Sequence, residues 1–326
     1  MAHQILFVAY DQGPRRALSI VAEKLVASVV ADGAENFPSS ADAVVIGLSS
    51  PLNAGVEYAA AHFASTRTIP LVVFSDTFGA WRREWFADIR KQAKLLFVSS
   101  DDEVKEASVL FPHATVIAVG NPMWDEYLLP PAFNRADARE SIGVSQEHVV
   151  FLPGTKNFGR NSEMLYSLLG AVNAIPGGKR DQVLVVYGKH PGDKNDACEY
   201  ESVSRNFAKV AFRLLPEHLR ADDIIAGLDV VAHPANSSVG LHALMCGIPV
   251  VTVPFISLDY YITSECGGWD YVPCSLRPES IPELSVMLEQ RLVGMAFGPW
   301  CTLPQDLQHL EPGASLNLMT SALRAL

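Results

Sequence analysis

The chain has 326 residues, which is enough for two domains of ordinary size. Hydrophobic residues make up 49% of it and charged residues 19%, a composition that excludes a disordered protein. It has 25 basic and 36 acidic residues, and the resulting net charge of −11 argues against nucleic acid as a partner, because phosphate backbones repel acidic chains.

The five cysteines and the first residues point to a protein of the cytoplasm. No two cysteines have C-x-x-C spacing and their number is odd, so neither a disulfide framework nor a zinc site is expected. The opening apolar run lacks a preceding basic segment and is typical of a first β-strand rather than of a signal peptide. No apolar run approaches the roughly 18 residues that a membrane span needs.

Short apolar runs alternate with segments of helical spacing along the first half. The expected strands are 4–9, 43–47, 71–74, 94–98 and 115–119. Helices are expected between them, among them 14–30, 53–63 and 101–111. Apolar, β-branched strands that alternate with helices predict a parallel sheet covered on both faces.

The pattern stops at residues 121–135, where three prolines interrupt it, and then starts again. The second set of expected strands is 148–152, 182–187, 210–214, 230–232 and 249–253. Helices are expected at 161–173, 216–227 and 238–246. The chain is therefore predicted to be an α/β protein with two Rossmann-like, doubly wound domains, 1–135 and 136–326, facing a cleft. The last helix, 316–326, is left unassigned, with packing on the first domain as one option.

Ligands of open parallel sheets bind beyond the carboxyl ends of the strands, so the loops that follow each strand are the candidate sites. The first strand of the second half is followed by Gly154, Thr155 and Lys156. Glycine lets backbone N–H groups approach an anion and lysine adds a positive charge. An ordinary turn with a solvated lysine is the alternative interpretation.

His190 stands just beyond the next strand of the second half. Its imidazole can donate a hydrogen bond to a phosphate oxygen. A partly exposed loop histidine without a function is the alternative.

A third candidate loop follows the strand that ends near residue 232. Ser237 and Ser238 open a short helix there, Gly240 lies in its first turn, and Gly247 is expected to end it. Serine is a common helix cap, which is the structural interpretation. Hydroxyl groups and unbonded N–H groups at a helix start also form an anion site, which is the functional one.

Segment 237–251 resembles the nucleotide-binding segment of GT-B fold glycosyltransferases and of the related non-hydrolysing UDP-N-acetylglucosamine 2-epimerases. The resemblance rests on the Ser-Ser pair, the spaced small residues, the glycine at the helix end and the Pro-Val-Val strand. Val119-Gly120-Asn121-Pro122-x-x-Asp125 is similar to the link that precedes the second domain in that superfamily.

Lys189-His190-Pro191 and the Ser-Ser pair also resemble motifs of bacterial sialyl- and polysialyltransferases. The resemblance implies that His190, Ser237 and Ser238 hold the phosphate of a nucleotide sugar.

His242 departs from the pattern. Many GT-B proteins have a glutamate at this position, and its carboxylate accepts hydrogen bonds from ribose hydroxyls. An imidazole has one acceptor at most. His242 therefore makes a different sugar contact, marks a different ligand, marks a protein without activity, or is only a helix-surface residue.

The first half is expected to provide the acceptor side. Asp11 and Asp76 each follow an expected strand, so either carboxylate is a candidate general base for an acceptor hydroxyl. Each could instead be a helix N-cap. Trp81, Trp85 and Phe86 lie among arginines, which is typical of a helix with buried aromatic residues. A platform for the acceptor and a peripheral membrane contact are the two alternatives.

The resulting hypothesis is a cytoplasmic glycosyltransferase, and the resemblance implies that it is bacterial and acts in polysaccharide biosynthesis. It moves a sugar from a nucleotide-sugar donor to an unknown hydroxyl acceptor, with no cofactor and no metal, because cationic and dipolar groups stabilise the leaving phosphate. Two alternatives are a nucleotide-sugar 2-epimerase of the same fold and a binding protein without catalytic activity.

Overall fold

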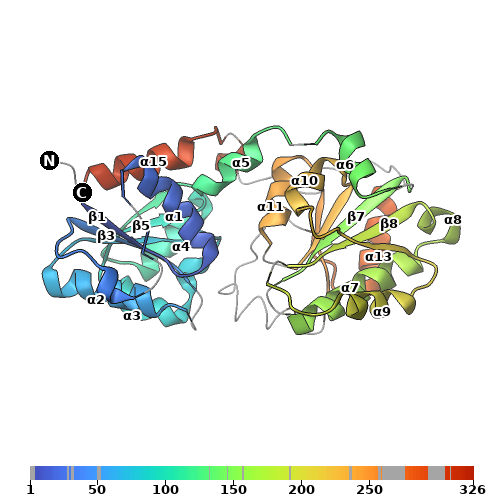
Figure 1. The fold of residues 1–326 in the computed structure, drawn as a ribbon, viewed down its shortest axis with the longest axis horizontal. Coiled ribbons are helices and arrows are strands. Elements are labelled where there is room, and N and C mark those ends of the chain that lie inside the picture. Colours follow the sequence, from blue (N-terminus) through green and yellow to red (C-terminus); the bar gives the residue numbers. More distant parts are fainter. Residues whose placement is uncertain are drawn as a thin grey trace. The chain divides into compact units, whose positions relative to one another are not determined.

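The structure is a computed structural model that describes residues 4–27, 29–30, 33–49, 53–131, 133–144, 146–155, 158–190, 192–234, 237–255, 258, 276–292, 305–308 and 310–326. The chain divides into two compact units (Figure 1). Unit 1 contains Met1–Leu129 and the C-terminal Pro304–Leu326; unit 2 contains Pro130–Ile262 and Val272–Leu303.

Unit 1 is built on a parallel sheet in which the described residues form six strands in the order β2-β1-β3-β4-β5-β6. The strands are β1 (Ile5–Val8), β2 (Val29–Val30), β3 (Ala43–Gly47), β4 (Leu71–Phe74), β5 (Ala93–Val98) and β6 (Thr115–Ala118). The order reverses direction after β1, as in doubly wound sheets, so that helices cover both faces.

Alternation along the strands of unit 1 separates two hydrophobic cores. Phe7, Val45 and Phe97 point to the face covered by α1 (Gln12–Lys24) and α15 (Ala314–Arg324). Their neighbours along the strands point to the face covered by α2 (Gly55–Arg67) and α4 (Asp101–Leu110). Because both faces are covered, the strands are apolar at nearly every position, with Lys94 and Thr115 as exposed exceptions near strand starts, and this is the pattern that predicts these strands.

The remaining short helices of unit 1 lie in its connections: η1 (Ala34–Asn36), η2 (Ala80–Arg82), η3 (Glu84–Phe86), α3 (Ala87–Arg90), η4 (Pro122–Trp124), α5 (Asp125–Leu128) and α14 (Gln305–Gln308). The expected helix 14–30 is wrong at its end. Helix α1 stops at Lys24, and Val29–Val30 pairs with β1 as the edge strand β2. Both residues are β-branched, which favours the pleated strand once a partner is present.

Unit 2 repeats the architecture with a sheet of five described parallel strands in the order β11-β10-β7-β8-β9. They are β7 (His148–Pro153), β8 (Val183–Gly188), β9 (Ala211–Leu214), β10 (Val230–His233) and β11 (Val250–Thr252). Its helices are α6 (Arg135–Ser141), α7 (Phe158–Ala174), α8 (Gly177–Arg180), α9 (Ala197–Arg205), α10 (Ala221–Ile224), η5 (Ile225–Gly227), α11 (Ser238–Met245) and α13 (Ile281–Leu292). The expected helix 216–227 is shorter than predicted, since only 221–227 is helical.

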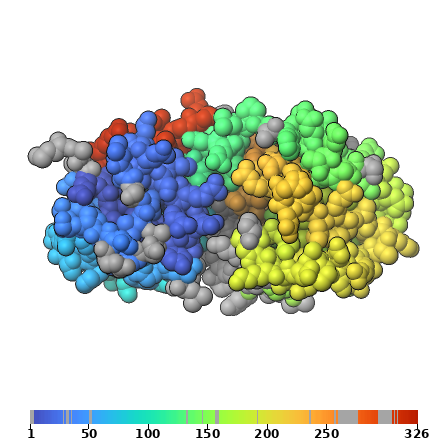
Figure 2. All heavy atoms as spheres, viewed as in Figure 1, coloured from blue at the N-terminus to red at the C-terminus, as the bar shows by residue number. Residues whose placement is uncertain are grey.

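The last helix packs within unit 1. Met319 and Leu323 of α15 are buried in the core beside α1, and Figure 2 shows the C-terminal segment on the surface of unit 1 next to N-terminal residues. The expected domain change at residues 135 and 136 falls just after the break between Leu129 and Pro130, and residues 304–326 lie in unit 1 rather than with 136–326.

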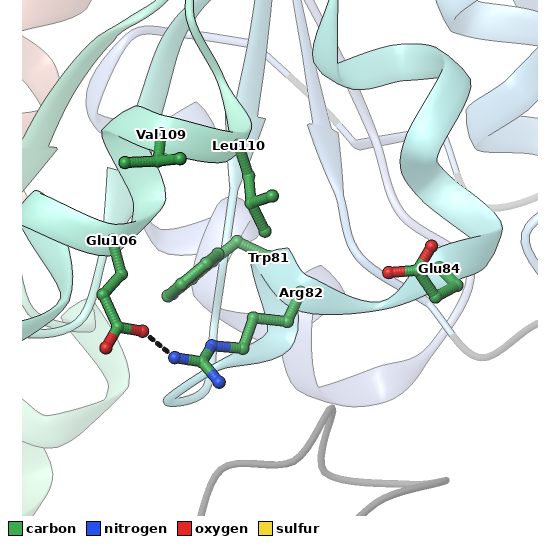
Figure 3. Close-up of a pocket in the computed structure, with 6 residues that line it drawn as sticks. All are labelled: Trp81, Arg82, Glu84, Glu106, Val109 and Leu110. Carbon is green, nitrogen blue, oxygen red and sulfur yellow. Dashed lines mark ion pairs between the residues drawn. The ribbon is translucent and has the colours of Figure 1, made fainter.

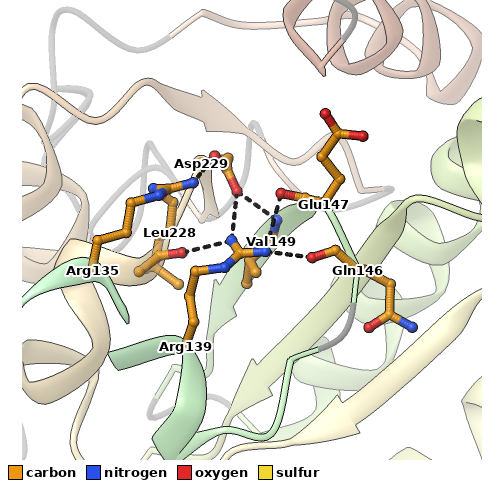
Figure 4. Close-up of polar contacts among 8 residues, drawn as sticks. Arg135, Arg139, Gln146, Glu147, Val149, Leu228 and Asp229 are labelled. Carbon is orange, nitrogen blue, oxygen red and sulfur yellow. Dashed lines mark hydrogen bonds and ion pairs between the residues drawn. The ribbon is translucent and has the colours of Figure 1, made fainter. Parts of the chain in front are cut away.

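A charged network fastens α6 to the amino end of the unit 2 sheet (Figure 4). Asp229, just before β10, pairs with Arg135 at 2.7 Å and with Arg139 at 3.3 Å, and it accepts the Val149 N–H at 2.7 Å. Arg139 also donates to the Glu147 carbonyl at 3.1 Å. Ligands of such sheets bind at the opposite, carboxyl end, so we assign this network to folding.

Candidate functional site

The carboxyl ends of three neighbouring strands of unit 2 bring the expected phosphate-binding residues to one edge. Strands β10, β7 and β8 are adjacent, and their pairing register puts Pro153 beside Gly188. Gly154 and Thr155 follow β7, His190 follows β8, and Ser237 and Ser238 follow β10. Parallel strands end on the same side of the sheet, so these loops gather at one edge.

The β7 and β8 loops are in direct contact. Gly154 donates its N–H to the Gly188 carbonyl at 2.7 Å. A Cβ at position 154 would lie 2.7 Å from the Tyr187 hydroxyl oxygen and 3.0 Å from the backbone nitrogen of His190. Such distances leave no room for a side chain, so only glycine fits between the two loops.

The His190 imidazole is oriented by its own loop. Its Nδ1 accepts the Gly192 N–H at 3.0 Å. In the neutral ring the proton is then on Nε2, which becomes a hydrogen-bond donor. Nε2 can then donate a hydrogen bond to a phosphate oxygen.

A buried polar network that the sequence did not reveal connects the loop after β7 to the loop after β8. Asn161 accepts from the Thr155 N–H at 2.9 Å and from its hydroxyl at 3.0 Å, and it donates to Asp193 at 3.3 Å. Tyr200 donates its hydroxyl proton to the same Asp193 oxygen. The Thr155 hydroxyl is therefore engaged in a hydrogen bond within the protein, and Asn161 fixes the conformation of the loop after β7.

Helix α11 begins at the third of these loops. Ser237 is its N-cap residue, but its side chain makes no capping hydrogen bond. Gly247, with φ of +73°, ends the helix as the sequence predicts. Gly240 lies against β10, because a Cβ there would be 3.0 Å from Nδ1 of the fully buried His233. Burial, with the charge of Arg277, lowers the pKa of His233 to about 3, so this imidazole is neutral.

His242 is not the helix-surface residue that one interpretation allowed. Its side chain is 6% exposed and its Nδ1 lies 2.7 Å from Oδ1 of Asp222 on α10. Burial alone would lower its pKa, but hydrogen bonds and charges from Asp222 and Cys246 raise it to about 9. The imidazole is therefore protonated at neutral pH and forms an ion pair.

Three residues of the expected motifs lie outside the described residues. They are Lys156, which was expected to add a positive charge, Pro191 of the Lys-His-Pro motif, and Asn236, which directly precedes the Ser-Ser pair.

The two candidate bases of unit 1 also lie at a common edge, beyond the adjacent strands β1, β3 and β4. Asp11 occupies the N-cap position of α1 without a capping hydrogen bond and instead accepts from the Asn53 amide at 2.8 Å. Asp76 is 6% exposed, and its Oδ2 lies 2.8 Å from where a Cβ of Gly13 would be. The Asp76 carboxylate thus lies against the first turn of α1, where the helix dipole favours negative charge.

Glu57 is a buried carboxyl group under the Asp11 loop that sequence reasoning missed. One of its oxygens accepts the Tyr10 N–H at 2.9 Å and the Ser49 hydroxyl, and Ser49 in turn accepts the Asp11 N–H at 2.9 Å. Burial raises the pKa of Glu57, while the bonds from Ser49 and Tyr10 oppose the rise. Glu57 is fully buried, so it shapes the loop rather than contacting a ligand.

The Asp76 loop is held from two sides. Asn121 donates its side-chain N–H to the Asp76 carbonyl at 2.9 Å. Glu103 accepts the Gly79 N–H and the Trp81 indole N–H, both at 2.8 Å. The Gly-Asn-Pro segment that resembles an interdomain link therefore also positions a candidate base.

A surface hollow beside α4 is lined by none of the expected site residues. Figure 3 shows Val109 and Leu110 over Trp81, with Arg82 directed to Glu106. Trp81 is 1% exposed, so it is part of the core and offers no face on which a sugar could stack.

The described residues contain neither a metal-binding cluster nor a helix suited to span a membrane. No three His, Cys, Asp or Glu side chains gather closely enough there to hold a metal ion. No helix in the described segments combines the length and apolar character of a membrane span.

The fold of this chain matches solved structures, whereas its sequence matches no known family. No family model and no curated protein matches the chain. The structure of Anabaena HepE in complex with UDP-glucose matches with a TM-score of 0.62 at 15% identity, covering 99% of this chain and 100% of that chain. WaaG, a glycosyltransferase involved in lipopolysaccharide biosynthesis, matches with a TM-score of 0.54 at 15% identity, covering 98% of each chain.

UDP-GlcNAc 2-epimerase from Neisseria meningitidis, bound to UDP-GlcNAc, matches with a TM-score of 0.58 at 12% identity, covering 96% of this chain and 90% of that chain. The protein therefore has the α/β GT-B fold that its sequence predicts, and its structural neighbours include glycosyltransferases and UDP-GlcNAc 2-epimerases.

Proposed function

We propose that the protein is a glycosyltransferase that moves a sugar from a nucleotide-sugar donor to a hydroxyl acceptor without a metal. The observation that carries the proposal is the edge of unit 2, where loops from three adjacent strands present Gly154, His190 and the start of α11 together. UDP is the nucleotide to test first, because structures of similar fold hold UDP-glucose and UDP-GlcNAc.

The donor side of the mechanism is electrostatic. Backbone N–H groups at the start of α11, with the Ser237 and Ser238 hydroxyls, provide donors for the phosphate oxygens. His190 adds a donor through Nε2, and we assign Lys156 a positive charge in the same role. Groups fixed in this way stabilise the charge that develops on the leaving diphosphate, which is the chemistry that glycosyl transfer needs.

The acceptor side is assigned to the edge of unit 1. A general base there takes the proton from the acceptor hydroxyl as the new glycosidic bond forms and the bond to the diphosphate breaks. Asp76 is the first choice because its loop is held by both Asn121 and Glu103. Asp11 is the second, on the neighbouring loop.

The test separates donor binding from turnover. His190→Ala should weaken UDP binding about tenfold, the loss expected for one hydrogen bond to a charged group. Asp76→Asn should keep UDP binding but abolish UDP release from UDP-glucose or UDP-GlcNAc in the presence of a panel of hydroxyl acceptors. Calorimetry measures the first effect and a UDP-release assay the second.

Exposed residues of the same types provide matched controls. His218→Ala and Asp88→Asn lie on the surface of the same units and should change neither quantity. The proposed site is wrong if His190→Ala and Asp76→Asn both behave like these controls. Binding of UDP without any turnover would favour a binding protein.

A nucleotide-sugar 2-epimerase is the second candidate, favoured by the match to the N. meningitidis enzyme. An epimerase needs no acceptor. Incubation with UDP-GlcNAc alone should then give an epimeric sugar nucleotide, whereas a transferase should leave the sugar configuration unchanged until an acceptor is added.

A further inference from the structure

The loop that carries His190 is built around a buried carboxylate, that of Asp193, which is 8% exposed. Its Oδ2 accepts the Tyr200 hydroxyl and, at 3.3 Å, the side-chain N–H of Asn161. Its Oδ1 accepts the Asn195 backbone N–H at 3.0 Å. Burying a carboxylate is costly unless hydrogen bonds satisfy it, and the donors that the described residues give this one are all neutral groups.

These hydrogen bonds tie the loop to the helical layer beside it. Asn161 comes from α7 and Tyr200, which is fully buried, comes from α9. The two helices pack against each other (Figure 1). The Asp193 side chain is therefore anchored to the framework of unit 2 rather than to its own loop alone.

The backbone of the same residue leads to the His190 ring. Asp193 donates its N–H to the His190 carbonyl at 2.8 Å, which closes a turn over residues 190–193. Gly192, inside this turn, donates the N–H that Nδ1 of His190 accepts at 3.0 Å. A Cβ at position 192 would lie 3.3 Å from that nitrogen, so the ring lies against the backbone of the turn. A shift of Asp193 would move the N–H group that orients the imidazole.

The charge of Asp193 has the wrong sign for a phosphate site, because a carboxylate at this edge acts against an anion. Asparagine has nearly the same shape and no charge, but its amide has a single acceptor oxygen and brings N–H donors toward groups that are themselves donors. The carboxylate at position 193 is thus explained by the hydrogen bonds that it accepts and not by its charge.

We infer that Asp193 is a positioning residue of the donor site: through the turn at residues 190–193 it holds the His190 imidazole with Nε2 as the hydrogen-bond donor. Asp193 does not contact the nucleotide, and its effect on binding passes through His190. This inference rests on the proposed function, which assigns His190 to the phosphate of the donor.

The first experiment is a double-mutant cycle on the full chain, with UDP affinity measured by calorimetry. Asp193→Asn should weaken UDP binding about fivefold, a coupling expected within one hydrogen-bond network, although the change removes a negative charge. In the His190→Ala background the same substitution should cost less than about twofold, because the group through which Asp193 acts is already gone. A contribution to folding alone would lower the affinity by the same factor in both backgrounds.

The second experiment needs no nucleotide. Nitrogen-15 NMR of the histidine side chains reports which ring nitrogen carries the proton, and the His190 signals are identified by their loss in His190→Ala. At about pH 8, where a free imidazole is neutral, the unchanged protein should show an unprotonated Nδ1 and a protonated Nε2. In Asp193→Asn both signals should move toward the average of the two tautomers, because the Gly192 N–H no longer holds the ring.

Asp196→Asn is the matched control. Asp196 is an exposed residue of the same loop, and its carboxylate accepts the Cys198 N–H at 3.1 Å as the N-cap of α9. The substitution removes the same charge, and asparagine is an equally good N-cap. UDP affinity should stay within about twofold of the unchanged protein and the His190 tautomer should not change.

Tyr200→Phe keeps the test valid if Asp193→Asn does not fold. It retains the buried ring and removes only the hydroxyl that donates to Asp193. Both measurements should change in the same direction as in Asp193→Asn, by a smaller amount.

The outcomes separate this inference from the proposed function. Equal losses of UDP affinity in the two His190 backgrounds, or an unchanged His190 tautomer in Asp193→Asn, overturn the role of Asp193 and leave the donor site standing. If the unchanged protein does not bind UDP, the proposed function is wrong, and the NMR comparison still decides whether Asp193 holds the imidazole.

Discussion

Two fully buried glutamates, Glu57 and Glu103, shape the candidate acceptor side of unit 1. Glu103 accepts the Gly79 and Trp81 N–H groups through one oxygen and the Ser99 and Ser100 N–H groups through the other. Its carboxylate thus joins the loop after β4, which carries Asp76, to the start of α4. Burial raises the pKa of Glu103 to about 7, and these four donors oppose the rise.

We expect Glu103→Gln to lower the free energy of unfolding by about 1–3 kcal/mol, because an amide cannot accept all four N–H groups and leaves buried donors without partners. Urea denaturation at pH 7 measures the change. Glu106→Gln, on the same helix with a side chain 54% exposed, is the control and should have little effect. Equal stabilities of the two variants would contradict the role given to Glu103.

The raised pKa of Glu103 leads to a second prediction, that the free energy of unfolding depends on pH. The pKa of Glu103 is about 7 in the folded chain against 4.5 for the free group, so the folded state keeps the proton to higher pH. Proton binding at Glu103 therefore favours the folded state. This contribution to the free energy of unfolding is fully present below pH 4.5 and is lost as the pH rises through about 7. Unfolding measured between pH 4.5 and 7 should show this decline, and Glu103→Gln should flatten it.

Helix α15 is held in place by residues far away in the chain. Gly120, with φ of +72°, lies against Ser315 at the start of the helix, where a Cβ would be 2.5 Å from the Ser315 hydroxyl. Met319 and Leu323 complete the core that α1 covers. The C-terminal helix is therefore part of the N-terminal sheet domain.

Met319→Ala should destabilise unit 1 by about 2–5 kcal/mol, because the shortened side chain leaves a cavity in a packed core. Leu318→Ala is the matched control: Leu318 is the preceding residue and is 49% exposed, so its loss should cost less than about 0.5 kcal/mol. Tryptophan fluorescence during urea denaturation follows the change, since Trp81 and Trp124 are buried in unit 1. Similar costs for both variants would show that α15 does not contribute to the core.

For the whole molecule, the proposal assigns donor binding to unit 2 and acceptor chemistry to unit 1. UDP at about 100 times its Kd should then raise the free energy of unfolding by about 2.7 kcal/mol. Hydrogen exchange should locate the effect, with slower exchange near Gly154, His190 and Ser238 and little change near Asp11. Protection from exchange that is confined to unit 1 would reverse the assignment of the two units. If no nucleotide stabilises the protein against thermal unfolding, the result would favour a protein that binds another class of ligand.

The sequence alone was sufficient for ten of the eleven described strands and for the choice of the loops that form the candidate site. Strands buried on both faces are apolar, so β3 and β4 have the predicted bounds, and the other predicted strands differ by one residue at one end or at both. Because ligands of parallel sheets bind beyond the strand ends, the same pattern selects the loops of Gly154, His190 and Ser237. These conclusions depend on local composition and period, which the sequence displays directly.

Only the tertiary structure decided which residues support those loops and how the charges pair. Glu57 meets Tyr10, Glu103 meets Gly79, and Asp222 meets His242 across 47, 24 and 20 positions of the chain, respectively. A carboxylate near a strand end has the same local sequence whether it caps a helix, binds a ligand or neutralises a distant histidine. Folding removes that ambiguity, because burial makes an unpaired charge costly and so requires a partner that only the packed chain provides.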